Sequence, residues 1–131
     1  MAYRSFEDLE VWQRGCRLSV AIYKASEKCR RFSIKDLVER AGLSIASNIA
    51  EGAERGSSKE FAHFLSFSKG SCGELRTQLY IARKLSAVTR KDFEELVAET
   101  KEMSAMLQGL CRSVLSNTRP KMKRAPKALK T

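Results

Sequence analysis

Proline is nearly absent from this chain of 131 residues. The two prolines are Pro120 and Pro126, and the sequence before them has no alternating runs of β-branched residues. Because proline breaks helices and alternation marks strands, this pattern predicts helices throughout. No apolar run approaches the ~20 residues that a membrane span requires, and no apolar leader follows Met1. We therefore expect an all-α, cytoplasmic protein with no membrane partner.

Metal-ligating and catalytic patterns are also missing. Cys16, Cys29, Cys72 and Cys111 form no CxxC pair, and His63 is the single histidine, so no ligand set has the usual zinc spacing. No nucleophile, base and orienting group converge, and no glycine-rich phosphate loop follows a strand. We expect a non-enzymatic protein without metal or cofactor, whose cysteines are free thiols in a reducing compartment.

Capping signals divide the body of the chain into four helices. Four Ser or Thr residues each precede an acidic residue by three positions, which is the spacing of a capping box. Apolar residues recur every three or four positions after each of them. Because long helices with short connections pack as antiparallel neighbours, residues 1–116 are predicted to form an all-α, antiparallel up-and-down four-helix bundle. The expected helix starts are Ser5, Ser33, Ser57 and Thr89.

The charge is strongly positive, with a formal net value of +10. Residues 117–131 contain six basic residues and no acidic one. We expect this tail to be a disordered arm that can contact nucleic acid, with a merely solvated chain end as the alternative. The tail residues assigned to RNA binding are Lys121, Lys123 and Arg124.

Basic residues also form strips on the first and third predicted helices. On the third, Lys69, Arg76 and Arg83 repeat every seven residues, with Tyr80 on the same strip. Such strips suit a polyanion because each phosphate contact releases counterions, and a tyrosine can stack on an unpaired base. Solvated helix edges are the alternative. The strip on the first helix consists of Arg14, Arg17, Lys24, Lys28 and Arg31.

The first helix also has two apolar lines on opposite sides. We expect Leu9, Trp12, Cys16, Val20 and Tyr23 to face the bundle core. A helix that is apolar on two sides has two neighbours, so the second line predicts a contact between subunits; scattered exposed apolar residues are the alternative. That second line is Val11, Gly15, Leu18 and Ile22, and a patchier line on the third helix is His63, Phe67, Gly70, Ile81 and Leu85.

The stretch SIASNIAEG, residues 44–52, raises a different question, because Asn48 falls between two isoleucines of the predicted buried face. We expect its amide to bond to a neighbouring helix or to the following turn and so to fix the register. With that turn near Arg55, Gly70 and Gly73 lie opposite residues 38–42, where close backbone approach would offset their low helix propensity. Asn48, Gly70 and Gly73 are therefore assigned to a structural lock.

Three segments in order, FEDLEVWQRG, LSIASNIAEGAERGSSKEF and KGSCGELRTQLYIARKL, resemble the four-helix bundle family of ribosomal RNA intervening-sequence proteins. The resemblance covers about residues 5–115. That family is related to the accessory variability determinant proteins of diversity-generating retroelements. Its usual proline after Ser-Ile is Ala46 here, which predicts a straighter second helix.

The resemblance implies a four-helix bundle, commonly a homopentamer, and no catalysis. Family members are encoded within intervening sequences of large-subunit ribosomal RNA genes, and the retroelement relatives bind RNA and reverse transcriptase. Together with the basic strips, this predicts an oligomeric bundle that binds structured RNA. The alternative is a protein-interaction scaffold or reverse-transcriptase accessory protein with no direct RNA role.

Overall fold

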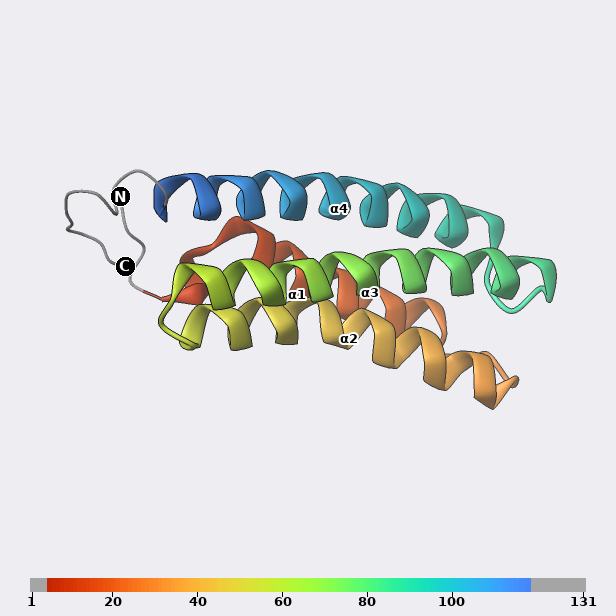
Figure 1. Ribbon diagram of the computed structural model, residues 1–131. Helices are drawn as coiled ribbons and strands as arrows, with labels where there is room; N and C mark the ends of the chain where they lie inside the picture. The colour runs from red at the N-terminus through yellow and green to blue at the C-terminus, as the bar shows by residue number, and fades with distance from the viewer. Residues whose placement is uncertain (1–4, 119–131) are drawn as a thin grey trace.

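Four long helices run antiparallel to one another in the computed structural model (Figure 1), which describes residues 5–118. The described part contains no strand, so the predicted all-α four-helix bundle is confirmed. The α1–α2 and α3–α4 turns lie at one end of the bundle, and the α2–α3 turn lies at the other (Figure 1). The elements are η1 (Phe6–Asp8), a short 3-10 helix, then α1 (Glu10–Ala25), α2 (Phe32–Glu54), α3 (Ser58–Lys84) and α4 (Arg90–Thr118).

The predicted basic tail falls almost wholly outside the described residues. Helix α4 continues to Thr118, two residues into the segment assigned to the tail. The tail residues Lys121, Lys123 and Arg124 lie outside the described residues. Among the helices that are described, none is both long and apolar enough to cross a membrane.

Side-chain caps fix three of the predicted starts. Ser5 forms a capping box with Asp8, although the element that follows is η1 and not α1. The Ser57 hydroxyl accepts the Glu60 backbone N–H at 3.1 Å, and the Thr89 hydroxyl accepts a backbone N–H three residues later, also at 3.1 Å. These bonds satisfy amide groups that the first turn of a helix leaves unpaired.

Helix α2 begins without a side-chain cap. Its N-cap position is Arg31, so the helix starts ahead of Ser33 and the predicted start at that serine is wrong. From Phe32 the helix runs through Ala46 to Glu54 without interruption.

The core receives apolar side chains from all four helices. On α2 and α3, Ile45, Ile49, Leu65 and Leu75 are fully buried, and Leu107 of α4 is buried with them. Burying one such side chain stabilises the fold by about 1.5–3 kcal/mol.

Helix α1 enters this core with the face opposite to the predicted one. Leu18 and Ile22 are only 2% and 1% exposed, and Val11 and Gly15 are also buried. A methyl group added at Gly15 would lie 3.3 Å from the Cβ of Ala46 on α2. The prediction that Val11, Gly15, Leu18 and Ile22 form a subunit contact is therefore wrong, because these residues pack within one chain.

The line of α1 that was expected to face inward is partly in solvent. Val20 is 54% exposed and Tyr23 is also exposed, whereas Trp12 packs only at the edge of the core. The physical reason is the presence of small residues at the α1–α2 crossing. A Cβ at Gly42 would lie 3.3 Å from the Ile22 side chain, so glycines on both helices allow the close approach.

The predicted glycine lock between α2 and α3 is wrong. Gly70 and Gly73 are exposed, and a Cβ added at either would meet no atom within 4 Å. The close approach lies nearer the turn, where a Cβ at Gly52 would come to 2.5 Å from the Cβ of Phe64. Gly52 is thus the α2 glycine whose missing side chain lets α3 pack.

Serine hydroxyls join α2 to α3. The fully buried Ser68 donates to the Ile45 carbonyl at 2.7 Å, and Ser44 donates to the Ser71 hydroxyl, also at 2.7 Å. Asn48 is partly buried, but its amide donates to the Ser44 carbonyl one turn earlier in its own helix, at 2.9 Å. The recorded bond of Asn48 thus reaches neither a neighbouring helix nor the following turn, as had been predicted, and serines supply the bonds between α2 and α3.

Candidate nucleic-acid interface

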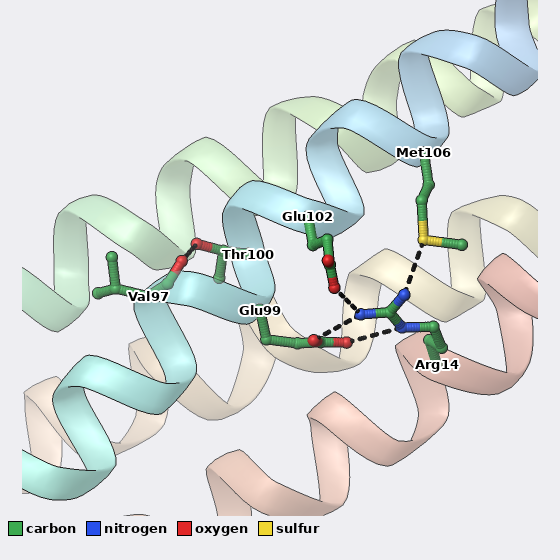
Figure 2. Close-up of polar contacts among 6 residues, drawn as sticks. All are labelled: Arg14, Val97, Glu99, Thr100, Glu102 and Met106. Carbon is green, nitrogen blue, oxygen red and sulfur yellow. Dashed lines mark hydrogen bonds and ion pairs between the residues drawn. The ribbon is translucent and has the colours of Figure 1, made fainter.

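Arg14, the first residue of the predicted α1 strip, is engaged within the chain. Figure 2 shows its guanidinium reaching from α1 to α4, where Nη2 and Nε donate to the two carboxylate oxygens of Glu99 at 2.7 and 3.1 Å. Nη2 also donates to a carboxylate oxygen of Glu102, and Nη1 donates to the Met106 sulfur. The hydrogen bond to Glu99 is the main reason why the pKa of Arg14 lies above its usual value. The charge of Arg14 is therefore compensated internally, which leaves this residue less suited than the other strip residues to the predicted RNA contact.

The basic strip of α3, whose residues repeat every seven positions, lies beside α4. The side chains of Lys69, Arg76 and Arg83 each donate to a neutral acceptor on α4 or on the turn before it. They hold α3 to its neighbour while their positive charge has no carboxylate partner among residues 5–118. The respective acceptors are the Gln108 side chain (2.8 Å), the Thr100 hydroxyl (3.0 Å) and the Val88 carbonyl (2.9 Å).

Tyr80 lies on the same side of α3, half exposed. Its ring makes an edge contact with Phe93, with ring centroids 5.1 Å apart and an interplanar angle of 82°. Part of the aromatic surface that was predicted to stack on a base is therefore used to pack α3 on α4.

The two strips meet at an open cavity of about 670 Å³ at the end of the bundle that carries the α1–α2 and α3–α4 turns (Figure 1). Five basic residues line it, against the two acidic residues Glu27 and Asp92, which leaves an excess of three positive charges. Within the described part of the chain, none of the five is paired with a carboxylate. The five are Lys24, Lys28, Arg30, Arg31 and Arg83.

The α3–α4 turn supplies the apolar part of the cavity wall. After α3 ends, Ser86 has φ +59°, a left-handed conformation common where helices end. The Ala87 amide then donates to the Ala82 carbonyl at 2.8 Å, which closes the turn tightly. As a result Leu85, Ala87 and Val88 line the cavity beside the cations.

The basic strips predicted from the sequence thus contain some of the cavity-lining cations but not all of them. One cavity is lined by residues of both predicted strips: Lys24, Lys28 and Arg31 come from the α1 strip, and Arg83 comes from the α3 strip. Arg30 was not assigned, and its only sequence signal is its position beside Arg31. Among the other assigned residues, Arg17 is exposed on α1 and does not line the cavity.

The described residues offer no competing metal site, because they contain no group of three or more His, Cys, Asp or Glu side chains placed to hold an ion. Burial raises the pKa of the Cys72 thiol to about 11, which keeps this core cysteine neutral. The cation-lined cavity is therefore the candidate site that the described residues support best.

The comparisons with known proteins agree with this architecture. A solved structure of a protein of unknown function, from the S23 ribosomal protein family of Bacteroides thetaiotaomicron, superimposes with a TM-score of 0.72 at 22% identity. The match covers 78% of this chain and 98% of that one, and it supports the fold. No curated protein matches the sequence. A family model described as 23S rRNA-intervening sequence protein matches residues 7–109, and the chain therefore belongs to that family.

Proposed function

We propose that this protein is a non-enzymatic, oligomeric helical bundle that binds structured, ribosomal RNA-associated RNA through the basic surface at one end of the bundle. The observation that carries the proposal is the convergence of five cations on one open cavity, where none of them is ion-paired with a carboxylate of residues 5–118. The five are Lys24, Lys28, Arg30, Arg31 and Arg83. The family's description, which refers to 23S rRNA, agrees with this choice of ligand.

The excess of positive charge around the cavity favours phosphate binding for two reasons. Each phosphate that they neutralise releases condensed counterions, which supplies most of the affinity at low salt. Arg83 is also held in place by its bond to the Val88 carbonyl, so less side-chain entropy is lost when it binds. If all five cations contact phosphates, affinity should fall roughly 100- to 500-fold between 50 and 200 mM salt.

The test is an electrophoretic mobility series with 23S ribosomal RNA fragments at several salt concentrations. We expect the unmodified chain to bind and the double variant Lys28→Glu/Arg31→Glu to bind much more weakly. The matched control is Lys59→Glu/Arg112→Glu, which makes the same change in charge at the opposite end of the bundle and should retain most of the affinity. Removal of residues 117–131 should weaken binding without abolishing it. If the unmodified chain shows no binding at low salt, the proposal fails.

Self-association belongs to this proposal, and it needs a surface other than the buried line of α1. Exposed apolar residues lie at helical spacing along α3, at Phe67 and Ile81, and Leu85 at the C-cap of the helix continues the line. We expect copies of the chain to meet along this α3 line, and the family resemblance implies a pentamer. Light scattering should show an oligomer for the unmodified chain and a smaller, still helical species for Phe67→Lys/Ile81→Lys. A monomeric unmodified chain would contradict the oligomer.

The same α3 line supports a second candidate function, an interaction scaffold or a reverse-transcriptase-type accessory protein. Exposed apolar side chains mark a surface for protein contact where they form a contiguous patch. This candidate predicts that the cavity variant Lys28→Glu/Arg31→Glu leaves binding of the partner protein unchanged, whereas Phe67→Lys/Ile81→Lys abolishes that binding.

A further inference from the structure

We propose that the cation-lined cavity and the neighbouring Phe32 form a site for an unpaired segment of RNA, in which Phe32 stacks on a base and the cations hold the adjacent phosphates. The inference rests on the proposed RNA-binding function and goes further, because it specifies single-stranded or looped RNA over duplex.

Phe32 is unusually exposed for an apolar side chain. It is 70% exposed, more than any other large apolar side chain in the described part of the chain. It is the first residue of α2 and directly follows Arg31, which lines the cavity. Leaving a phenylalanine in water forgoes the free energy of burying it, and this ring, next in sequence to a cavity-lining arginine, is accessible to a ligand.

The wall of the cavity matches both halves of a nucleotide. Leu85, Ala87 and Val88 provide apolar surface, and the five cations provide positive charge around it. An unpaired nucleotide offers an apolar base face and an anionic phosphate to such a wall. Bases inside a duplex are stacked and paired, so a duplex could contact the cations but not the apolar wall. The volume of about 670 Å³ is within the range of small-ligand pockets.

The contrast with Tyr80 supports the choice of Phe32 as the stacking residue. Tyr80 packs edge-on against Phe93, whereas Phe32 makes no ring contact with any other aromatic side chain among residues 5–118. Arg30 and Arg31 immediately precede Phe32, and both line the cavity, so positive charge lies close to the residue proposed to stack on a base.

The experiment is fluorescence anisotropy with labelled RNA of about 12 nucleotides, compared as a single strand and as a blunt duplex of the same length. The unmodified full chain should bind the single strand more tightly. Phe32→Ala should lower single-strand affinity roughly 5- to 150-fold and leave duplex affinity unchanged. The matched control is Leu43→Ala, another exposed apolar side chain of α2 that does not line the cavity, which should leave both affinities unchanged. Circular dichroism establishes that each variant is folded.

Three results would overturn the inference, and they differ from failure of the proposed function. Equal binding of single strand and duplex would show that the surface recognises charge alone. Unchanged single-strand binding by Phe32→Ala would remove the stacking role. Tight binding of polyglutamate that is insensitive to Phe32→Ala would assign the cavity to an acidic peptide. If instead the unmodified chain binds neither RNA at low salt, the proposed function and this inference both fail.

Discussion

Gly52 provides the sharpest test of the packing between α2 and α3. In Gly52→Ala the new Cβ would lie 2.5 Å from the Cβ of Phe64, where carbon atoms normally pack at about 3.5–4.0 Å. Both atoms are fixed to backbone, so no rotamer change relieves the overlap and the helices must move apart. The overpacking costs about 1–3 kcal/mol, against a gain of about 1 kcal/mol in helix propensity. We expect a net destabilisation of up to about 2 kcal/mol.

The matched control is Gly73→Ala on α3, because a Cβ there meets no atom within 4 Å. This variant should gain about 0.5–1 kcal/mol from helix propensity alone. Urea and thermal unfolding, followed by circular dichroism at one protein concentration, should therefore move the two midpoints in opposite directions. If Gly52→Ala is as stable as Gly73→Ala, the close approach assigned to Gly52 is refuted.

Three further predictions concern buried polar groups and the core thiol. Ser68→Ala should be about 1 kcal/mol less stable than Ser66→Ala in urea unfolding, because only Ser68 bonds across helices, to the Ile45 carbonyl; equal midpoints would contradict this. Gln78→Met should keep or raise the melting temperature, since the Gln78 side-chain oxygen is buried without a hydrogen-bond partner among the described residues; a clear loss would reveal a missed interaction. Burial raises the Cys72 pKa from 9.0 to about 11, so its contribution to stability is complete below about pH 9 and is lost between pH 9 and 11. The melting temperature of the unmodified chain should accordingly fall more steeply over that range than that of Cys72→Ala.

The four helices could be predicted from the sequence because their signals are local. The Ser57 and Thr89 caps are found where the spacing to an acidic residue placed them, and the apolar stripes of α2 and α3 supply the core. The start of α2 was missed because Ser33 has the spacing of a cap, whereas the N-cap position is Arg31.

The inward face of α1 could not be predicted from its own pattern. This helix has two apolar lines on opposite sides, and the line that is buried is the one that contains Gly15. Gly15 meets Ala46, and Gly42 meets Ile22, so the choice depends on small residues of two different helices meeting at one crossing. Hydrophobicity alone favoured the line with Trp12.

The basic residues show a similar limit. Arg14 and Arg31 look alike in the sequence, yet Arg14 is paired with Glu99, 85 positions away, and Arg31 has no carboxylate partner among the described residues. Likewise, the proximity of Arg31 to Arg83 arises from the meeting of two turns at one end of the bundle. Contacts between residues so far apart in the sequence cannot be predicted from the local spacing of basic residues.

The salt dependence of RNA affinity shows whether the cavity cations hold phosphates, as we propose. The measurement is the slope of log affinity against log salt for the unmodified chain and for Lys28→Gln/Arg31→Gln, with Lys59→Gln/Arg112→Gln as the control. Removing two phosphate contacts should flatten the slope by about 1.4–1.8 in the cavity variant and by much less in the control. Identical slopes in all three proteins would contradict the assignment of RNA binding to this end of the bundle.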